Sequence, residues 1–225
     1  MYKKILTLFA LLFTITAFAV AQGTDYGVDY YRNGENEIIR KGVYAEVDGS
    51  PLLYEAWLPA KVTTTNGKVY DNVKLNYNIY EDMLTFVYDT ADKPLKFQEQ
   101  VKSFILYTPG ALTFASNFPA VDKQSTTSFY QVLSGNGKTA LLKKYLKSLN
   151  VIKNYNSTET KRFQDANAYY VYKDGKMLKI GKSKSDVLAA LADKKEQLDA
   201  FAKQSNINFK KDEDLAKLFD YYLSI

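Results

Sequence analysis

PAKVTTTNGKVYDNVKLNYNIYEDMLTFVYD, residues 59–89, carries the clearest structural pattern in the chain. Asn66-Gly67 is a dipeptide that two-residue hairpin turns favour, because both of its residues accept a positive φ. After this turn, apolar residues alternate with polar ones at Val73, Leu75, Tyr77 and Ile79. Such alternation places one face of a strand in a core and the other face in water. Glu81-Asp82 then turns the chain into another strand over 83–88, so the segment predicts consecutive antiparallel strands.

Further hairpin signals extend this pattern in both directions. Asp48-Gly49 separates GVYAEV from LLYEAWL, and Asp174-Gly175 separates two strands in AYYVYKDGKMLKI. Between them the chain keeps the pattern of short strands, with a polar excursion over 122–128. Short strands at this spacing predict an antiparallel β-meander, in a curled or barrel-like sheet whose edges are protected.

QVLSGNGKTALLKKYL, residues 131–146, ends its glycine-rich part with Gly-Lys-Thr, as a phosphate-binding loop does. The loop motif also needs a glycine at the position of Val132, and no alternating βαβ pattern surrounds the segment. We therefore expect no nucleotide site and favour a hairpin turn. A helix over 138–150 stays open as an alternative, because these residues also have helical spacing: Leu141, Leu142, Tyr145, Leu146 and Leu149.

The apolar period changes near the C-terminus. Ser183 and Asp186 form a capping box that opens a helix, and the apolar side of this helix continues through about Lys203. A second helix is expected from Asp212, where a run of acidic residues suits the positive N-terminal end of a helix.

Together these patterns predict an α+β fold, an antiparallel β-meander followed by a C-terminal pair of α-helices. We expect residues 42–225 to form a single β-rich unit, with the helical pair at about 184–225. A division of this unit near residue 120 is the alternative.

The N-terminus has the pattern of an export signal. Two lysines precede an apolar run over 5–18, and Ala19 and Ala21 supply the small residues that a signal peptidase needs. Residues 1–21 are therefore predicted to be a signal peptide, and the polar residues 22–41 a flexible N-terminal arm. No later segment is apolar enough for a transmembrane helix. We expect an exported protein, in the periplasm or at the outer cell surface.

The composition argues against several classes of chemistry. The chain contains no cysteine and no histidine, so disulfides and histidine-paired nucleophiles are absent and a zinc site is not expected. Without the signal peptide, 28 basic residues stand against 25 acidic ones, an excess too small to predict a nucleic-acid partner. We therefore predict no cofactor, no metal and no catalytic residue, and favour a non-enzymatic protein.

One enzymatic alternative rests on carboxylates, because most glycoside hydrolases work with a facing pair of them. The candidates are Glu46, Glu55, Glu81, Asp82 and Glu99. Nothing in the sequence pairs any two of these residues. The acidic stretch KKDEDL, residues 210–215, is better explained as a helix start than as a calcium loop.

Aromatic residues are abundant, with 19 tyrosines and 13 phenylalanines. These side chains suit the half-buried surface of a sheet. They predict either a β core with tyrosines at its margins or an aromatic platform that contacts sugar rings or peptides. For such a platform we single out Trp57, Tyr77 and Tyr80 as ligand-binding residues.

Three stretches, VKLNYNIYEDMLTF, VKSFIL and the ending LADKKEQLDAFAKQSNINFKKDEDLAKLFDYYLSI, resemble uncharacterised, β-rich exported proteins of Bacteroidetes-type bacteria. The resemblance covers most of the mature chain, implies no known activity and agrees with a periplasmic or surface location. Asp89-Thr90-Ala91 is similar to the O-glycosylation acceptor pattern of that lineage, which makes Thr90 a predicted modification site.

These observations favour a cell-envelope protein that binds a protein or envelope partner through a tyrosine-rich sheet. The alternative is a glycan-binding module or a carboxylate-dependent glycoside hydrolase.

Overall fold

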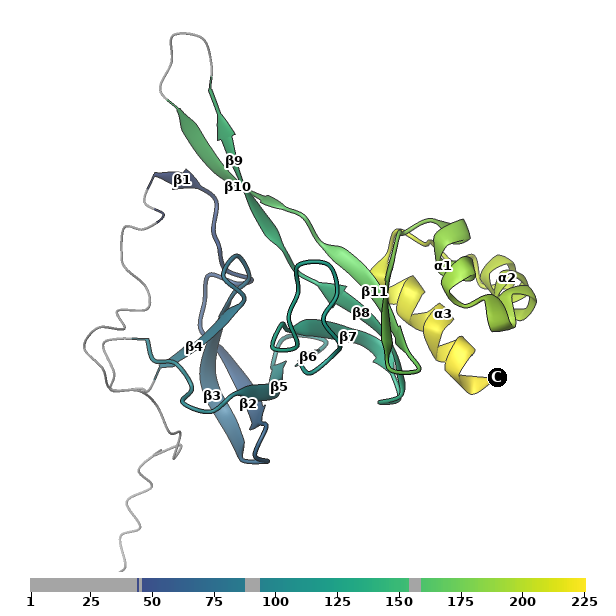
Figure 1. The fold of residues 1–225 in the computed structure, drawn as a ribbon, viewed down its shortest axis with the longest axis horizontal. Helices are drawn as coiled ribbons and strands as arrows, with labels where there is room; N and C mark the ends of the chain where they lie inside the picture. The colour runs from purple at the N-terminus through teal and green to yellow at the C-terminus, as the bar shows by residue number, and fades with distance from the viewer. Residues whose placement is uncertain (1–43, 45, 88–93, 154–158) are drawn as a thin grey trace, which may run out of the picture.

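The computed structural model describes residues 44, 46–87, 94–153 and 159–225 (Figure 1). The predicted signal peptide at 1–21, the predicted arm at 22–41 and Thr90 lie outside the described residues.

Nine antiparallel strands form the main sheet, in the order β12-β11-β8-β7-β6-β5-β2-β3-β4. The strands are β2 (Leu58–Thr64), β3 (Val69–Asn78), β4 (Met83–Val87), β5 (Val101–Leu106), β6 (Leu112–Ala115), β7 (Tyr130–Gly135), β8 (Thr139–Lys144), β11 (Ala168–Lys173) and β12 (Lys176–Ile180). Two meanders meet where β2 pairs with β5, and the predicted antiparallel β-rich architecture is confirmed. The edge strands β12 and β4 do not pair with each other, so the sheet is open and its curled or barrel-like form stays a prediction.

A second sheet has the order β1-β10-β9, built from β1 (Val47–Asp48), β9 (Lys147–Ile152) and β10 (Thr160–Asp165). The pairs Lys144↔Ala168 in the main sheet and Lys147↔Asp165 in the second sheet belong to one uninterrupted register. β9 and β10 are therefore the continuation of the β8–β11 pair beyond the main sheet, and Figure 1 shows them projecting from the body. We call β9 and β10 the projecting hairpin.

The hairpin predicted at Asp48-Gly49 is wrong. β1 pairs in parallel with β10, with Val47 opposite Lys161, and residues 52–57 form no strand beyond an isolated bridge at Leu52. The local dipeptide does produce a turn, since Gly49 has a φ of +83°. The strand before that turn, however, finds its partner more than a hundred residues along the chain.

The segment 131–146 forms the favoured hairpin, and the helical alternative is wrong. β7 and β8 are joined by a turn in which the side-chain oxygen of Asn136 accepts bonds from the N–H groups of Lys138 and Thr139, at 3.1 and 3.0 Å. Gly137 has a φ of +85°, which glycine adopts without steric cost. The Gly-Lys-Thr thus belongs to a tight turn.

The C-terminal region contains α1 (Lys184–Ala190), the 3-10 helix η1 (Ala192–Lys194), α2 (Lys195–Gln204) and α3 (Asp212–Ser224). Ser183 caps α1 by accepting a bond from the N–H of Asp186 at 3.1 Å, and α3 begins at Asp212 as predicted. The single helix predicted before Lys203 is instead broken at Leu191, which is fully buried. The break lets α1 pack on β12 while α2 packs on α3.

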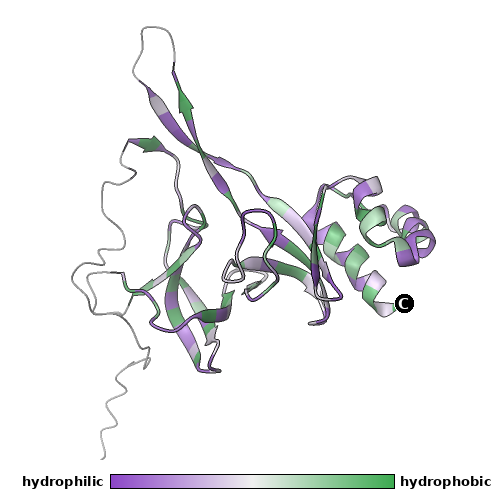
Figure 2. Ribbon diagram, in the orientation of Figure 1, coloured by the Kyte–Doolittle hydropathy of each residue, from purple (hydrophilic) through white to green (hydrophobic). Residues whose placement is uncertain are grey.

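Three hydrophobic cores result. The first lies on one face of β2–β6, the second lies between the other end of the sheet and the helices, and the third lies on the opposite face of β7, β8 and β11. Leu141 belongs to the second core and its neighbour Leu142 to the third, because successive side chains of a strand point to opposite faces. Figure 2 shows apolar residues along both the strands and the inner side of the helices.

Prediction on the hairpin turn. Replacing Gly135 with alanine should lower the free energy of unfolding by about 1–3 kcal/mol through overpacking. The added Cβ would lie 2.8 Å from the Cβ of Ala140 and 3.0 Å from the carbonyl oxygen of Thr139. Gly137→Ala is the matched control, because its Cβ would meet nothing within 4 Å and only a positive φ opposes it, at ~1 kcal/mol. Urea unfolding of both variants tests the prediction, which fails if Gly137→Ala costs as much.

Candidate functional site

The three aromatic residues singled out from the sequence lie in different surroundings. Tyr77, near the end of β3, is 2% exposed and packs edge-on against Phe104 and Phe114 in the first core. Trp57 is half-buried in the irregular segment before β2, and Tyr80 is 38% exposed in the turn between β3 and β4. Since Tyr77 is closed off from solvent, the three residues do not form a common aromatic platform.

Tyr80 instead belongs to a cluster at the base of the projecting hairpin. Its ring centroid lies 5.8 Å from that of Tyr44 and 5.1 Å from that of Phe163 on β10, and Tyr44 and Phe163 are 5.3 Å apart. The hydroxyl of Tyr44 donates to the carboxylate of Glu81 at 2.6 Å. Burial and this carboxylate raise the pKa of Tyr44 above its ordinary value. We call Tyr44, Tyr80 and Phe163 the base cluster, which attaches the hairpin to the β3–β4 turn.

Beyond the base cluster, the projecting hairpin exposes apolar side chains. Val151 is 47% and Ile152 is 44% exposed, while Phe163 is buried at the base. The described residues of the hairpin, 147–153 and 159–165, include four basic and two acidic side chains. Figure 2 shows apolar stretches on β9 far from the cores. The hairpin thus presents an apolar and basic surface.

The most concentrated polar chemistry lies at the end of β8, where the projecting hairpin leaves the main sheet. Lys144 is fully buried and forms an ion pair with Asp82, with 2.6 Å between Nζ and Oδ1. Its ammonium also donates to the carbonyl oxygen of Phe129 at 3.0 Å and to the hydroxyl of Tyr77 at 3.3 Å. Tyr77 in turn donates to Asp82 at 2.5 Å. We call Lys144, Asp82 and Tyr77 the junction cluster.

Burial dominates the electrostatics of the junction cluster. Desolvation lowers the pKa of Lys144 below the ordinary lysine value, and the Asp82 carboxylate opposes this shift. Burial and the same carboxylate raise the pKa of Tyr77 well above its ordinary value. Nearby, burial raises the pKa of Tyr130 to about 12, and the hydroxyl of Tyr130 has no hydrogen-bond partner among the described residues. An unpaired buried hydroxyl is destabilising.

Lys143, the preceding residue, forms a corresponding link on the other face of β8. Its ammonium contacts Asp212, the first residue of α3, at 2.7 Å, and Lys182 contacts the same carboxylate at 2.7 Å. Tyr169 donates to Asp212 at 2.8 Å. Burial alone would raise the pKa of Asp212, but these donors hold it below its ordinary value. Two consecutive lysines therefore connect β8 to the layers on its two faces.

The geometry argues against nucleophilic chemistry at Lys144. A lysine nucleophile needs a neutral amine that a substrate can reach. The ammonium of Lys144 is fully buried and its three hydrogens are matched by three acceptors, on Asp82, Phe129 and Tyr77. The junction cluster therefore has the properties of a structural connection.

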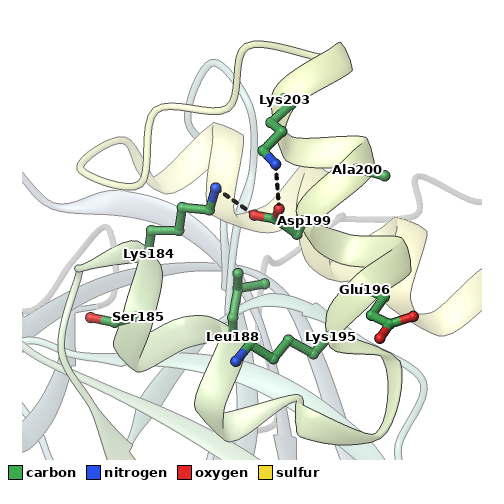
Figure 3. Close-up of a pocket in the computed structure, with 8 residues that line it drawn as sticks. All are labelled: Lys184, Ser185, Leu188, Lys195, Glu196, Asp199, Ala200 and Lys203. Atoms are coloured by element: carbon green, nitrogen blue, oxygen red, sulfur yellow. Dashed lines mark ion pairs between the residues drawn. The ribbon is translucent and has the colours of Figure 1, made fainter.

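A surface groove lies between α1 and α2 (Figure 3). Lys184 from α1 and Lys203 from α2 both form ion pairs with Asp199, the second at 2.8 Å, and Leu188 lies between the helices. The two lysines lower the pKa of Asp199 to about 2. Because Lys184 of α1 and Asp199 of α2 pair across the groove, we interpret it as a contact that joins two helices.

Three of the five candidate carboxylates are engaged with other partners, and the remaining two, Glu46 and Glu55, are exposed. Glu81 accepts a bond from Tyr44, Asp82 belongs to the junction cluster, and Glu99 pairs with Lys68 at 3.0 Å. The contacts of Glu99, first among them the bond from Lys68, lower its pKa, whereas a general acid needs a raised one.

Within the described residues, no group of three or more potential ligand side chains could hold a metal ion. No helix in this part of the chain has the length and apolar character needed to cross a membrane.

Comparison with known proteins finds no match to the chain among family models, curated proteins or solved structures.

Sequence reasoning missed both the junction cluster and the projecting hairpin. Lysines are expected at the surface, so nothing in LLKKYL indicated that Lys144 is buried. The one available signal was the length of the strand-like segment 139–152, which is longer than a single strand of average length.

Prediction on the junction cluster. Tyr77→Phe and Tyr130→Phe each remove one buried hydroxyl, and we expect opposite results. The first should lower the free energy of unfolding by about 1–2 kcal/mol, because it removes bonds to Asp82 and Lys144. The second should leave stability unchanged or raise it, because the hydroxyl of Tyr130 is buried without a partner. Urea unfolding of the two variants provides the measurement, and equal losses would contradict the prediction.

Proposed function

We propose that the protein is an exported, non-enzymatic component of the cell envelope that binds a partner protein through its projecting hairpin. The observation that carries this proposal is the position of the hairpin, which continues the β8–β11 pair beyond the main sheet and exposes Val151 and Ile152 there.

The energetics of a projecting hairpin support a binding role. A two-stranded hairpin without a core is marginally stable in water, and its exposed apolar side chains lower the free energy when they are buried. The base cluster holds the hairpin at Phe163, and β1 pairs with β10 at Lys161 and Arg162, the residues opposite Val151 and Asn150. Val151 and Ile152 remain exposed on the neighbouring strand. A partner that covers these two residues would bury apolar surface at little cost in ordering the hairpin.

The glycan-binding or hydrolase alternative receives less support from the geometry. The ring of Tyr80 is held in T-shaped contacts with Tyr44 and Phe163 in the base cluster. Glu81, Asp82 and Glu99 each bond a tyrosine or a lysine of the same chain.

The location of the protein is also a proposal. Export rests on the signal-peptide pattern of residues 1–21, and modification of Thr90 rests on its local sequence. A periplasmic or outer-surface location fits a protein whose function is to hold a partner in the envelope.

Prediction on the binding surface. A photo-crosslinking residue placed at position 152 of the full chain, in cells of the native host, should yield one discrete crosslinked protein. The same residue at position 178 is the matched control, because Leu178 on β12 is also exposed, at 52%, but lies at the far edge of the main sheet. Val151→Asp should reduce the crosslinked product about tenfold by placing a charge in the apolar contact. Identical products from both positions, or none from either, would contradict the proposal.

Prediction on export. Intact mass spectrometry of the protein from the native envelope should show a chain that begins at Gln22, together with an added glycan on the peptide that contains Thr90. A mass that includes residues 1–21 would refute the signal peptide, and an unmodified Thr90 peptide would refute the modification.

A further inference from the structure

One hydrogen bond shows which backbone groups of β9 face away from β10. The N–H of Ala166 donates to the carbonyl oxygen of Leu146 at 2.9 Å, so this pair is of the hydrogen-bonded type. Hydrogen-bonded and non-hydrogen-bonded pairs alternate along an antiparallel ladder. In the register of the projecting hairpin, the N–H and C=O groups of Lys147, Leu149 and Val151 therefore point outward.

This outer edge of β9 has no strand beside it among the described residues. The equivalent edge of β10 is different, because β1 pairs with it opposite Lys161 and Arg162. Within the described part of the chain, the projecting hairpin thus has one covered edge and one edge with a row of unpaired backbone donors and acceptors, which is the template that an added strand needs.

The side chains of the same residues make a repeating pattern on one face. Lys147, Leu149 and Val151 alternate along β9 and Lys153 follows its end, with two apolar side chains between two lysines. Lys147 pairs with Asp165 at 3.4 Å and Lys153 pairs with Glu159 at 3.2 Å. The Lys147 side chain is 16% exposed beside a carboxylate that is 69% exposed, whereas Lys153 is 76% exposed, and an exposed pair of this kind holds its lysine only weakly.

The charges determine which strand fits. A second copy of β9 paired antiparallel about Asn150 would place Lys147 of each chain opposite Lys153 of the other. Like charges directly opposite one another are destabilising. A strand with acidic residues in those positions and apolar residues between them would instead match the lysines and cover Leu149 and Val151.

We propose that β9 binds an extended segment of a partner protein as an added β-strand, with the alternating pattern acidic–x–apolar–x–apolar–x–acidic. This inference rests on the proposed function and adds the mode of binding and the chemistry of the partner. The backbone bonds to Lys147, Leu149 and Val151 supply affinity, and the two lysines select the charge of the segment.

The test is an NMR titration of the isotope-labelled mature chain, residues 22–225, with two capped peptides, ETVTVTE and KTVTVTK. The acidic peptide should shift and protect the amides of Lys147, Leu149 and Val151, and should bind about tenfold more tightly than the lysine peptide at low salt. Shifts at another surface, or equal binding of both peptides, would overturn the proposal.

Two substitutions at one position separate backbone pairing from side-chain contact. Val151→Pro removes an outward N–H and leaves the β9–β10 hydrogen bonds intact, whereas Val151→Ala keeps the N–H. Binding of ETVTVTE should be abolished by the first substitution and reduced only a few-fold by the second. If Val151→Pro itself disrupts the cross-strand contacts between β9 and β10, Leu149→Pro, which also removes an outward N–H, is tested in its place. Equal effects of proline and alanine would overturn strand addition.

The failure of this inference can be distinguished from failure of the proposed function. If the crosslinked partner at position 152 persists in Val151→Pro and neither peptide binds, the hairpin contacts a partner by another mode. Sedimentation of the mature chain tests whether a second copy of the chain occupies the β9 edge instead. A dimer that Val151→Pro abolishes would identify such a copy and would overturn the proposal of an acidic partner segment.

Discussion

The rest of the structure depends on the ion pair between Lys144 and Asp82. Removing a lysine from water costs several kcal/mol, so a fully buried ammonium is stable only where its charge and its hydrogens are matched. Asp82 from the β3–β4 turn, Tyr77 from β3 and the carbonyl of Phe129, just before β7, provide this match. Because these partners belong to one meander and to the segment that enters the other, the lysine connects the two meanders.

The same turn holds the projecting hairpin. Asp82 forms an ion pair with Lys144 at the end of β8. Its neighbours in the same turn contact the base of the hairpin: Tyr80 packs against Phe163, and Glu81 accepts a bond from Tyr44. β8 and β9 lie on one continuous register, so contacts on both sides of their junction define the direction in which the hairpin leaves the body. Because the hairpin already has a defined direction, it loses less conformational entropy when a partner binds. Stability of the junction and function of the hairpin are thus linked through the β3–β4 turn.

What could be predicted from the sequence was local. The turns at Asn66-Gly67 and Asp174-Gly175, the cap at Ser183 and the start of α3 depend on residues a few positions apart, and the structure contains all of them. The partner of β1 and the break at Leu191 depend on distant contacts, which no local pattern encodes. The burial of Lys144 also depends on distant contacts. Alternation places Tyr77 on an apolar face, but only the folded structure shows that Lys144 is buried and bonds to its hydroxyl.

Two of the edge strands, β12 and β9, illustrate how side-chain charge can select among partners. On β12, Lys176 and Lys179 lie on either side of the exposed Leu178, which is a common way of preventing strands from pairing at an edge. On β9, the lysines stand farther apart and leave two consecutive outward positions, Leu149 and Val151, between them. In the register centred on Asn150, this spacing opposes pairing between copies, because it brings lysine against lysine. It does not oppose a strand that carries carboxylates at the matching positions, so the charges that disfavour this pairing between copies favour an acidic partner.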